Sequence, residues 1–555
     1  MTGTAGLWLI LLTPLAPLLV AGLAALPRAR RRLPALALAA PLPALAAALL
    51  ARDAEVGLPW LLLGTQLGLD GTGRAFLLLF AALWTLGGWH AFAYLRQDAR
   101  RSAFTLWFLL AMAGNLGLAV AQDALTFYVF FALMSFASYG LVVHDRKPES
   151  LRAGRVYMGL VVTGELALFS GIVLAVAAAG AAFDAPRAVP PLALALLAVG
   201  FGIKAGLVPL HVWLPLAHPA APVPASAVLS GAMIKAGLLG ALRFLPLPGP
   251  EGAGEALVLV GAASALFGVA VGVVQTNPKA LLAYSSISQT GLVAIGLGLA
   301  LLAADPGIAA AAVAAAILFA LHHGLAKASL FFGTAIAPGG SAGPARALRL
   351  LGLALPALAL AAAPLTSGAI AKSALKAIEG GPGWLDLFLS LSSVATTVLL
   401  VRFLALMAGK TAVESRGIVW PWAASVVVST LAFWLLPQAA DALGYALTRP
   451  ALIDSLWPVL AGLALGTALA WRLRAAGRPL VPPGDLLALG RPLGSLASRA
   501  APATRPAIPP ASPVPLAPTI GAWLRRVEER SHAWAPGAAL TGLVASLLAV
   551  SLLWP

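Results

Sequence analysis

Four lysines lie inside long apolar stretches of this sequence: Lys204, Lys235, Lys327 and Lys372. A charged side chain at the centre of a bilayer costs roughly 2.5–3.5 kcal/mol, so such residues are rare unless they serve the passage of ions or protons. Desolvation favours the neutral amine and a nearby carboxylate favours the ammonium, so a buried lysine can gain and lose a proton near neutral pH. Each lysine could instead be a structural tie, hydrogen-bonded to another helix. Because four occur on separate stretches, together with histidines, we favour a proton relay.

Histidine and hydroxyl side chains accompany the lysines. His323 and Lys327 are four residues apart, which places them on the same face of a helix. An imidazole beside an amine can exchange protons with it through intervening water. For His322, a core position satisfied by a neighbouring hydroxyl is the more plausible role. The hydroxyl groups of nearby serines could hold water. They could instead only join helices, and joining helices is the commoner role of Ser and Thr in membrane spans. The supporting candidates are His211, His218, His322, Ser285 and Ser286.

The composition indicates that membrane-spanning helices must position these residues. Of 555 residues, 60% are hydrophobic and 10% are charged, whereas about 25% are charged in a typical soluble domain. A helix needs about 20 apolar residues to cross a bilayer, and the sequence predicts an all-α polytopic protein with sixteen spans. The predicted spans are about 5–26, 33–50, 73–95, 103–121, 124–143, 156–180, 190–212, 223–245, 256–274, 280–303, 307–336, 349–372, 385–409, 418–437, 452–471 and 537–554.

The absence of cysteine limits the chemistry that the chain can perform. It excludes disulfides, thiolate-bound zinc and cysteine-ligated iron–sulfur clusters. The sequence also contains no glycine-rich dinucleotide turn and no phosphate-binding loop. We therefore expect no cofactor, no metal site and no redox chemistry in this chain, although it could be part of a redox-driven translocase.

Basic residues are distributed unevenly among the predicted loops. Loops that follow odd-numbered spans hold 25 of the 36 Lys and Arg residues, whereas the other loops hold five. By the positive-inside rule the first set is cytoplasmic, which predicts that both termini face outside. This asymmetry accounts for most of the net charge of +16 without nucleic acid. The expected location is the inner membrane of a bacterial cell.

Two of the predicted spans contain helix breakers. Pro209 follows Lys204 in the seventh span, and Pro364 and Gly368 precede Lys372 in the twelfth. Proline removes a backbone donor and kinks a helix, and interruptions at corresponding places in two halves of a chain indicate a transport site. We therefore predict an internal repeat. The predicted divisions are N-terminal helices (1–102), a first repeat (103–250), a second repeat (251–410), further core spans (411–471), a Pro/Arg-rich cytoplasmic segment (472–536) and a last span (537–555).

The segments Phe201–His218 and Ala221–Gly237 strongly resemble the signature of the proton-conducting antiporter-like family. That family includes membrane-arm subunits of respiratory complex I, large subunits of Mrp-type cation/proton antiporters and their relatives in membrane-bound hydrogenases. Residues 281–289, 323–327 and 364–372 resemble three further motifs of the family. The resemblance implies a core of fourteen helices with two inverted five-helix repeats, broken seventh and twelfth helices, and a proton path through the middle of the membrane. The residues that it assigns to this path are Lys204, Lys235, His323, Lys327 and Lys372.

One position departs from the family pattern. A glutamate is expected in the fifth span as the partner of Lys204, and Ala132 stands in its place. Glu165, the one acidic residue clearly in the middle of a predicted span, is a candidate for the missing carboxylate. The alternative is that the first half of the path is altered or inactive and that Glu165 ties two helices together.

These observations predict a proton-translocating subunit that works with other membrane subunits, with sodium as a further candidate ion. Two alternatives stay open. A single-chain carrier of an organic solute would need a large central cavity, and a scaffold subunit would no longer pump. In 472–536 the eleven prolines between positions 479 and 518 exclude one continuous helix, so we expect an irregular segment with short interfacial helices at 485–499 and 520–530. Residues 482–485 resemble the D-type branch of the Mrp antiporters.

Overall fold

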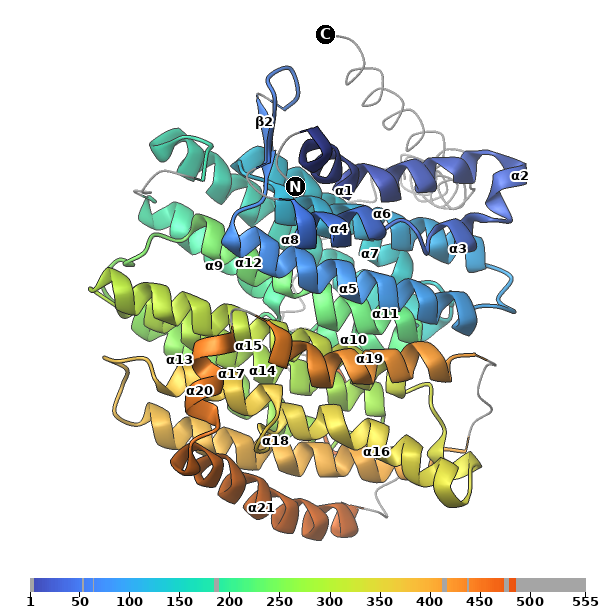
Figure 1. The fold of residues 1–555 in the computed structure, drawn as a ribbon, viewed down its shortest axis with the longest axis vertical. Coiled ribbons are helices and arrows are strands. Elements are labelled where there is room, and N and C mark those ends of the chain that lie inside the picture. Colours follow the sequence, from blue (N-terminus) through green and yellow to red (C-terminus); the bar gives the residue numbers. More distant parts are fainter. Residues whose placement is uncertain are drawn as a thin grey trace, which may run out of the picture.

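The computed structural model describes residues 4–51, 54–62, 64–183, 189–411, 417–436, 439–473 and 479–485. In this part of the chain, helices lie roughly parallel to one another and crossways to the longest axis of the molecule (Figure 1). The chain progresses along that axis, from the N-terminal helices at one end to α21 at the other. The longest dimension of the described protein is therefore roughly perpendicular to its helix axes.

Twelve helical stretches among the described residues are long and apolar enough to cross a membrane. This finding agrees with the predicted all-α polytopic architecture. They are α1 with η1 (Thr4–Gly22 and Leu23–Ala25), α5 (Gly71–Tyr94), α6 (Arg101–Val120), α7 (Ala124–Val142), α8 (Pro148–Ala179), the run α11–η2–α12 (Val223–Phe244), α13 (Ala253–Gly272), α14 (Pro278–Leu302), α15 (Pro306–Gly333), α16 (Gly343–Leu360), α18 (Leu385–Ala408) and α21 (Arg449–Arg472). Two shorter apolar helices are α9 (Pro191–Ala205) and α19 (Val419–Leu431), which η4 (Ala432–Leu435) extends.

The second predicted span is not one helix. Residues 33–50 form α3 (Leu33–Leu36) and α4 (Leu42–Leu50), preceded by α2 (Pro27–Arg30). Prolines lie in the first turn of α3 and of α4, where the missing N–H is tolerated. The same prolines cannot lie in the middle of a continuous helix without breaking its hydrogen bonds. The prediction of a single span here was wrong, because it relied on the apolar character of residues 33–50 and neglected the prolines that interrupt them.

The predicted breaks in the seventh and twelfth spans are confirmed. After α9 the chain turns at Gly206, whose φ is +72°, and resumes as α10 (Leu214–Ala220). A Cβ on Gly206 would lie 1.9 Å from the Leu214 side chain, so only glycine fits this turn. After α16 the chain turns at 361–366, with φ of +62° at Leu365, and continues as α17 (Ser367–Lys376).

The eighth span has an irregularity that the sequence did not predict. Between α11 (Val223–Val228) and α12 (Lys235–Phe244), residues Leu229–Met233 form the π-helical turn η2. A π turn shifts the register of a helix and occurs frequently at functional sites. Here it immediately precedes Lys235.

The remaining described elements are small. Strands β1 (Glu55–Leu58) and β2 (Thr65–Gly68) form an antiparallel hairpin with Val56 opposite Leu67. The short helices are η3 (Pro338–Gly340) and α20 (Ala440–Ala446). The last predicted span at 537–554, the predicted helix at 520–530 and nearly all of the predicted helix at 485–499 lie outside the described residues. The inverted relation between the two groups of five helices stays a prediction.

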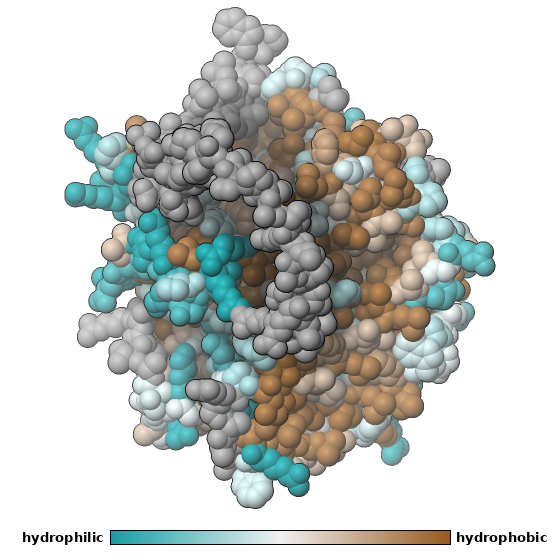
Figure 2. Space-filling model, turned by 180° about the vertical axis from the view of Figure 1, so that it is seen from behind, coloured by the Kyte–Doolittle hydropathy of each residue, from teal (hydrophilic) through white to brown (hydrophobic). Residues whose placement is uncertain are grey.

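The outer surface fits a helix bundle in a bilayer. Figure 2 shows a broad hydrophobic face, with hydrophilic residues gathered mainly along one edge. Among the exposed apolar side chains are Leu166 on α8 and Leu259 on α13, at 64% and 61% exposure. Such surfaces contact lipid or partner proteins rather than water.

Candidate functional site

The first polar cluster surrounds Lys204, which lies in the last turn of α9, next to the break. Its Nζ donates a hydrogen bond to Ser135 Oγ of α7 at 3.0 Å and lies 5.4 Å from the centre of the Phe131 ring. The side chain is buried, with the residue 6% exposed. Helix α9 therefore ends next to Lys204. The Ser135 hydroxyl and the Phe131 ring contact the lysine inside the bundle.

Glu165 of α8 is buried and borders the same small cavity as Lys204 and Ser135. The cavity measures about 10 Å³, which is close to the space that one water molecule needs. Glu165 interacts electrostatically with Lys204 and with the Ser135 side chain, while its Oε2 has no hydrogen-bond partner. The structure thus brings the predicted carboxylate within reach of the predicted lysine, although Ala132 contributes no charge from α7.

A second cluster joins the two halves of the chain through direct hydrogen bonds. Lys235 Nζ donates to the backbone carbonyl of Ser230 at 2.6 Å, and Ser230 Oγ bonds Ser286 Oγ of α14 at 2.8 Å. Ser286 Oγ and Lys327 Nζ both donate to the carbonyl of Leu282, at 3.0 and 2.9 Å. Lys235 of the first half and Lys327 of the second are therefore connected by two hydroxyls and two carbonyls.

Two glycines allow the halves to approach this closely. A Cβ on Gly231 of η2 would lie 3.0 Å from the carbonyl oxygen of Gly324 of α15, and one on Gly324 would lie 2.7 Å from the carbonyl oxygen of Gly231. Real Cβ contacts are essentially never shorter than 3.0 Å. The helices meet through bare backbone here, one residue from Ser230 and one from His323. We call this contact the glycine crossing.

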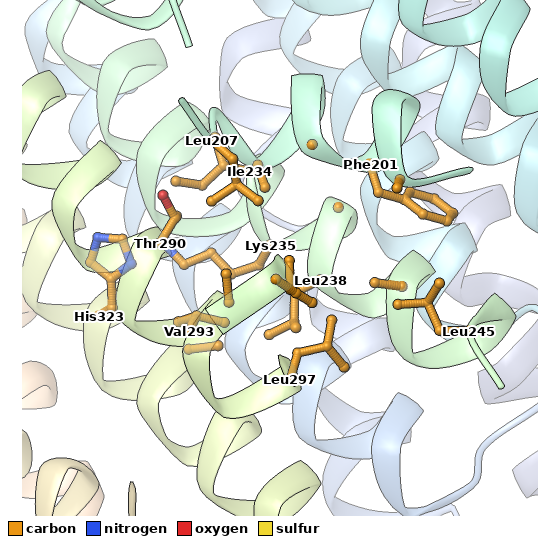
Figure 3. Close-up of a pocket in the computed structure, with 18 residues that line it drawn as sticks. Phe201, Leu207, Ile234, Lys235, Leu238, Leu245, Thr290, Val293, Leu297 and His323 are labelled. Atoms are coloured by element: carbon orange, nitrogen blue, oxygen red, sulfur yellow. The ribbon is translucent and has the colours of Figure 1, made fainter. Parts of the chain in front are cut away.

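A cavity of about 90 Å³ lies between α9, α12, α14 and α15 beside the crossing. In Figure 3 the side chain of Lys235 extends toward Thr290 and His323 at its wall. His323 is fully buried, and neither ring nitrogen has a hydrogen-bond partner. A buried imidazole without partners is costly unless water satisfies it, and the cavity has room for several water molecules. Most of the lining is apolar, and Lys235, Thr290 and His323 supply the polar side chains that water in this cavity would contact.

A third cluster lies around the break in the twelfth span. His322 Nδ1 contacts Ser367 Oγ of α17 at 2.8 Å, which supplies the hydroxyl partner expected for this histidine. A Cβ on Gly368 would lie 1.8 Å from the carbonyl of Ala359, so glycine is needed for α17 to pack here. One turn later, Lys372 Nζ donates to three oxygen atoms of α18. They are Ser393 Oγ at 2.6 Å, Ser392 Oγ at 2.9 Å and the Leu389 carbonyl at 3.1 Å.

Sequence reasoning missed the polar groups that follow Lys372. Lys376 lies one turn further along α17, and its Nζ contacts Asp454 of α21 at 2.6 Å, Ser390 at 2.8 Å and Asp386 at 3.1 Å. The Asp386 side chain is 72% exposed, whereas Lys372 is 6% exposed. The i, i+4 spacing of the two lysines was visible in the sequence, but Asp454 is 78 residues from Lys376. We call Lys376, Asp386 and Asp454 the surface cluster.

The supporting residues divide into different environments. His218 is buried with both ring nitrogens unpartnered, and it stacks on Phe331 with ring centres 4.5 Å apart. His211, in the break of the seventh span, contacts Asp485 at 3.3 Å. Ser285 and Ser286 are both buried, and Ser286 is the one in the row between Lys235 and Lys327. No group of three His, Cys, Asp or Glu side chains in the described part of the chain is arranged to hold a metal ion.

Comparisons with known proteins match this geometry to a family. Residues 121–399, just over half of the chain, match the family model described as NADH:quinone oxidoreductase/Mrp antiporter, transmembrane. An uncharacterised protein of Mycobacterium tuberculosis is 38% identical over 289 residues, covering 49% of this chain and 45% of that protein. Hydrogenase-4 component B of Escherichia coli K12 is 32% identical over 284 residues, covering 48% and 42%. The chain thus spans less than half the length of these two curated relatives.

A solved structure is similar over a greater part of the chain. The structure of the Mrp complex from a Dietzia species aligns with a TM-score of 0.71 at 23% identity, covering 90% of this chain and 60% of the aligned one. At that identity the likeness concerns the fold. Together with the family match, it confirms the resemblance found in the motifs around Lys204, Lys235 and Lys327. This polytopic membrane protein therefore belongs to the NADH:quinone oxidoreductase/Mrp antiporter transmembrane family.

Proposed function

We propose that this chain is the proton-translocating membrane subunit of a multi-subunit cation/proton antiporter, or of a proton pump of the complex I or hydrogenase type. The observation that carries the proposal is that Lys235 and His323 border one buried cavity. A row of hydrogen bonds through Ser230 and Ser286 holds Lys235 close to Lys327 beside it. Amines, an imidazole and water are groups that can pass a proton on.

The proposed route follows the long axis of the molecule. In the first half, Glu165 and Lys204 exchange a proton across the small cavity that they share. The larger cavity, with water between Lys235 and His323, then connects the halves, while the row of hydrogen bonds between Lys235 and Lys327 holds the two lysines in position. In the second half, the proton passes from His323 and Lys327 to Lys372 and leaves through the surface cluster.

Cavity size supports proton movement over transport of an organic solute. The cavity at the glycine crossing holds about 90 Å³, whereas pockets for organic ligands measure about 300–1,000 Å³. A scaffold that had lost its pump would have no need for buried lysines, because a buried charge is costly to keep. The relay is thus the function that this arrangement favours.

We further propose the orientation and the partners. The basic loops would face the cytoplasm of a bacterial cell, with the N-terminus and the C-terminus outside, in the inner membrane. Other membrane subunits would supply the coupling to a cation gradient or to electron transfer. The exposed apolar side chains of helices such as α13 give such subunits a surface to contact.

The test of the relay is the substitution Lys204→Ala. We expect proton flux in vesicles containing the whole energised complex to fall by about tenfold or more, because the first half loses the base that receives its protons. If Glu165 acts through Lys204, Glu165→Gln should also reduce flux, and the double variant should be little worse than Lys204→Ala alone.

The matched control is Lys147→Ala, since the Lys147 side chain is 70% exposed. Its flux should equal that of the parent complex. Full flux in an assembled Lys204→Ala complex would show that the chain is a scaffold.

A second prediction concerns the proposed exit. Lys376→Met removes the ammonium that contacts Ser390, Asp386 and Asp454. We expect proton flux to fall several-fold, because the buried Lys372 then has no ammonium between it and the exposed carboxylates. Assembly should persist, since ion pairs with exposed carboxylates contribute at most about 1 kcal/mol. The measurement is flux per assembled complex in the same vesicles, and a parental rate would contradict the exit through this cluster.

A further inference from the structure

A short segment beyond α21 lies against the helix bundle. Residues 479–485 follow the described end of α21, and the carbonyl of Val481 accepts a hydrogen bond from Gln275 Nε2 at 2.9 Å. Gly484, with φ of +79°, turns the chain so closely against Leu216 that a Cβ would lie 3.1 Å from that side chain. Proline-rich segments are usually solvated, because they lack backbone donors. This one is instead held against α10 and the start of α14, and we call it the inserted segment.

The inserted segment places a carboxylate inside the protein. Asp485 is 4% exposed, and its Oδ2 lies 3.3 Å from Nε2 of His211, which is fully buried. The side chain of Tyr284 interacts with the same carboxylate. An ionisable pair taken out of water is costly unless it is well satisfied, yet His211 Nδ1 has no hydrogen-bond partner. The buried histidine is therefore incompletely satisfied, which a purely structural role does not explain.

Asp485 is one of three acidic side chains that are buried in the described part of the chain. Asp123 has a structural role, because its carboxylate accepts the backbone N–H groups of Thr126 and Gln66. Glu165 lies beside Lys204, as described above. Asp485 is the remaining one, and it faces a histidine, the side chain whose protonation changes most readily near neutral pH.

His211 connects this acid to the first polar cluster. It lies in the break between α9 and α10, two residues before Trp213. Trp213 Nε1 donates to the carbonyl of Ile203 at 2.8 Å, and its side chain borders the cavity of Lys204 and Glu165. The broken helix thus carries both Lys204 and His211, and Trp213 borders the cavity of Lys204 two residues after His211.

We propose that Asp485 is a proton-uptake residue, which the inserted segment brings to the broken seventh helix. This inference rests on the proposed proton translocation and its orientation, in which the inserted segment lies on the cytoplasmic side. A protonated Asp485 gives its proton from Oδ2 to Nε2 of His211. The resulting imidazolium releases a proton from Nδ1 to water on the way to Lys204, and Asp485 is recharged from the cytoplasm. The carboxyl group and the imidazole then have their starting charges. The imidazole regains its Nδ1–H tautomer by exchanging its Nε2 proton through water, so that Nε2 can accept the next proton.

The test is Asp485→Asn in the whole complex, because asparagine keeps the size of the side chain and an oxygen acceptor but cannot carry the proton. We expect proton flux to fall by about tenfold. Hydrogen–deuterium exchange of peptides covering 479–485 should be unchanged, which would show that the inserted segment stays in place. The control is Glu149→Gln, which neutralises an exposed acid at the start of α8 and should leave flux at the parental rate.

Two results would overturn the proposal. Parental flux in Asp485→Asn would mean that the carboxylate carries no protons. A fall in flux together with increased exchange at 479–485 would mean that the segment is a structural strap. The proposed function is tested separately by Lys204→Ala: loss of flux there with parental flux in Asp485→Asn rejects the uptake role alone, whereas full flux in Lys204→Ala rejects the relay itself.

Discussion

Replacing Lys235 with methionine is expected to reduce proton flux about 100-fold or more, which is the size of effect that removal of a proton-transferring group produces. Lys235 borders the cavity at the glycine crossing. It is also the first residue of the hydrogen-bonded row that ends at the Leu282 carbonyl, to which Lys327 donates. Lys235 is the one amine among the described residues that line this cavity, so under the proposed route protons from the first half cross through it. Methionine has a similar length and is apolar, so burying it costs less than burying an ammonium. The measurement is proton flux per assembled complex in energised vesicles.

Lys235→Arg distinguishes a relay from a fixed charge. Arginine keeps the positive charge and the donor groups but does not deprotonate in proteins, so a relay should be as defective with arginine as with methionine. If the ammonium only ties η2 to α12, arginine should restore most of the flux. Such a rescue would contradict the relay at this residue.

Filling the cavity at the glycine crossing is expected to stop flux without removing any titratable group. Ala294 and Ala320 line this cavity together with Lys235 and His323. A phenylalanine at position 294 would occupy space that water molecules need, and would leave the imidazole of His323 without a route to Lys235. We expect flux to fall about tenfold or more, at a cost in stability of roughly 1–3 kcal/mol for overpacking.

The matched control places the same side chain outside the cavity. Ala314 is exposed on α15, so Ala314→Phe should have parental flux and parental thermal stability. Assembly of the Ala294→Phe complex is checked by size-exclusion chromatography in detergent. An assembled Ala294→Phe complex with parental flux would mean that protons do not cross through this cavity.

The lysines of the central row could be picked out from the sequence, whereas most of the residues that bind them could not. The buried lysines could be found because charge in a long apolar run is conspicuous, and the two breaks because proline and glycine interrupt helices for local reasons. Ser135, Ser230 and Ser392 gave no such signal, since serine is common as a bond between membrane helices. Which hydroxyl meets which lysine depends on how helices pack, and no local pattern encodes that.

Contacts between distant residues were the least predictable part of the site. Asp485 is 274 residues from His211, and Asp454 is 78 residues from Lys376. Glu165 could be proposed as a partner of Lys204 because it is the acid in the middle of a predicted span. Asp485 belongs to a segment rich in proline that sequence reasoning placed in the cytoplasm. Hydropathy has no means of indicating that such a segment turns back into the bundle.

The glycine crossing limits how this protein can move. Gly231 and Gly324 meet backbone to backbone, and a single methyl group would not fit between them, so at this point no side chains separate the two halves. A carrier that works by alternating access rocks one helix bundle against another. Such movement requires an interface along which the two bundles can shift. The backbone contact between Gly231 and Gly324 opposes such rocking at this point. We therefore expect the proposed proton transfer to rely on side-chain rotamers and rearranging water, while the two helix backbones stay in place.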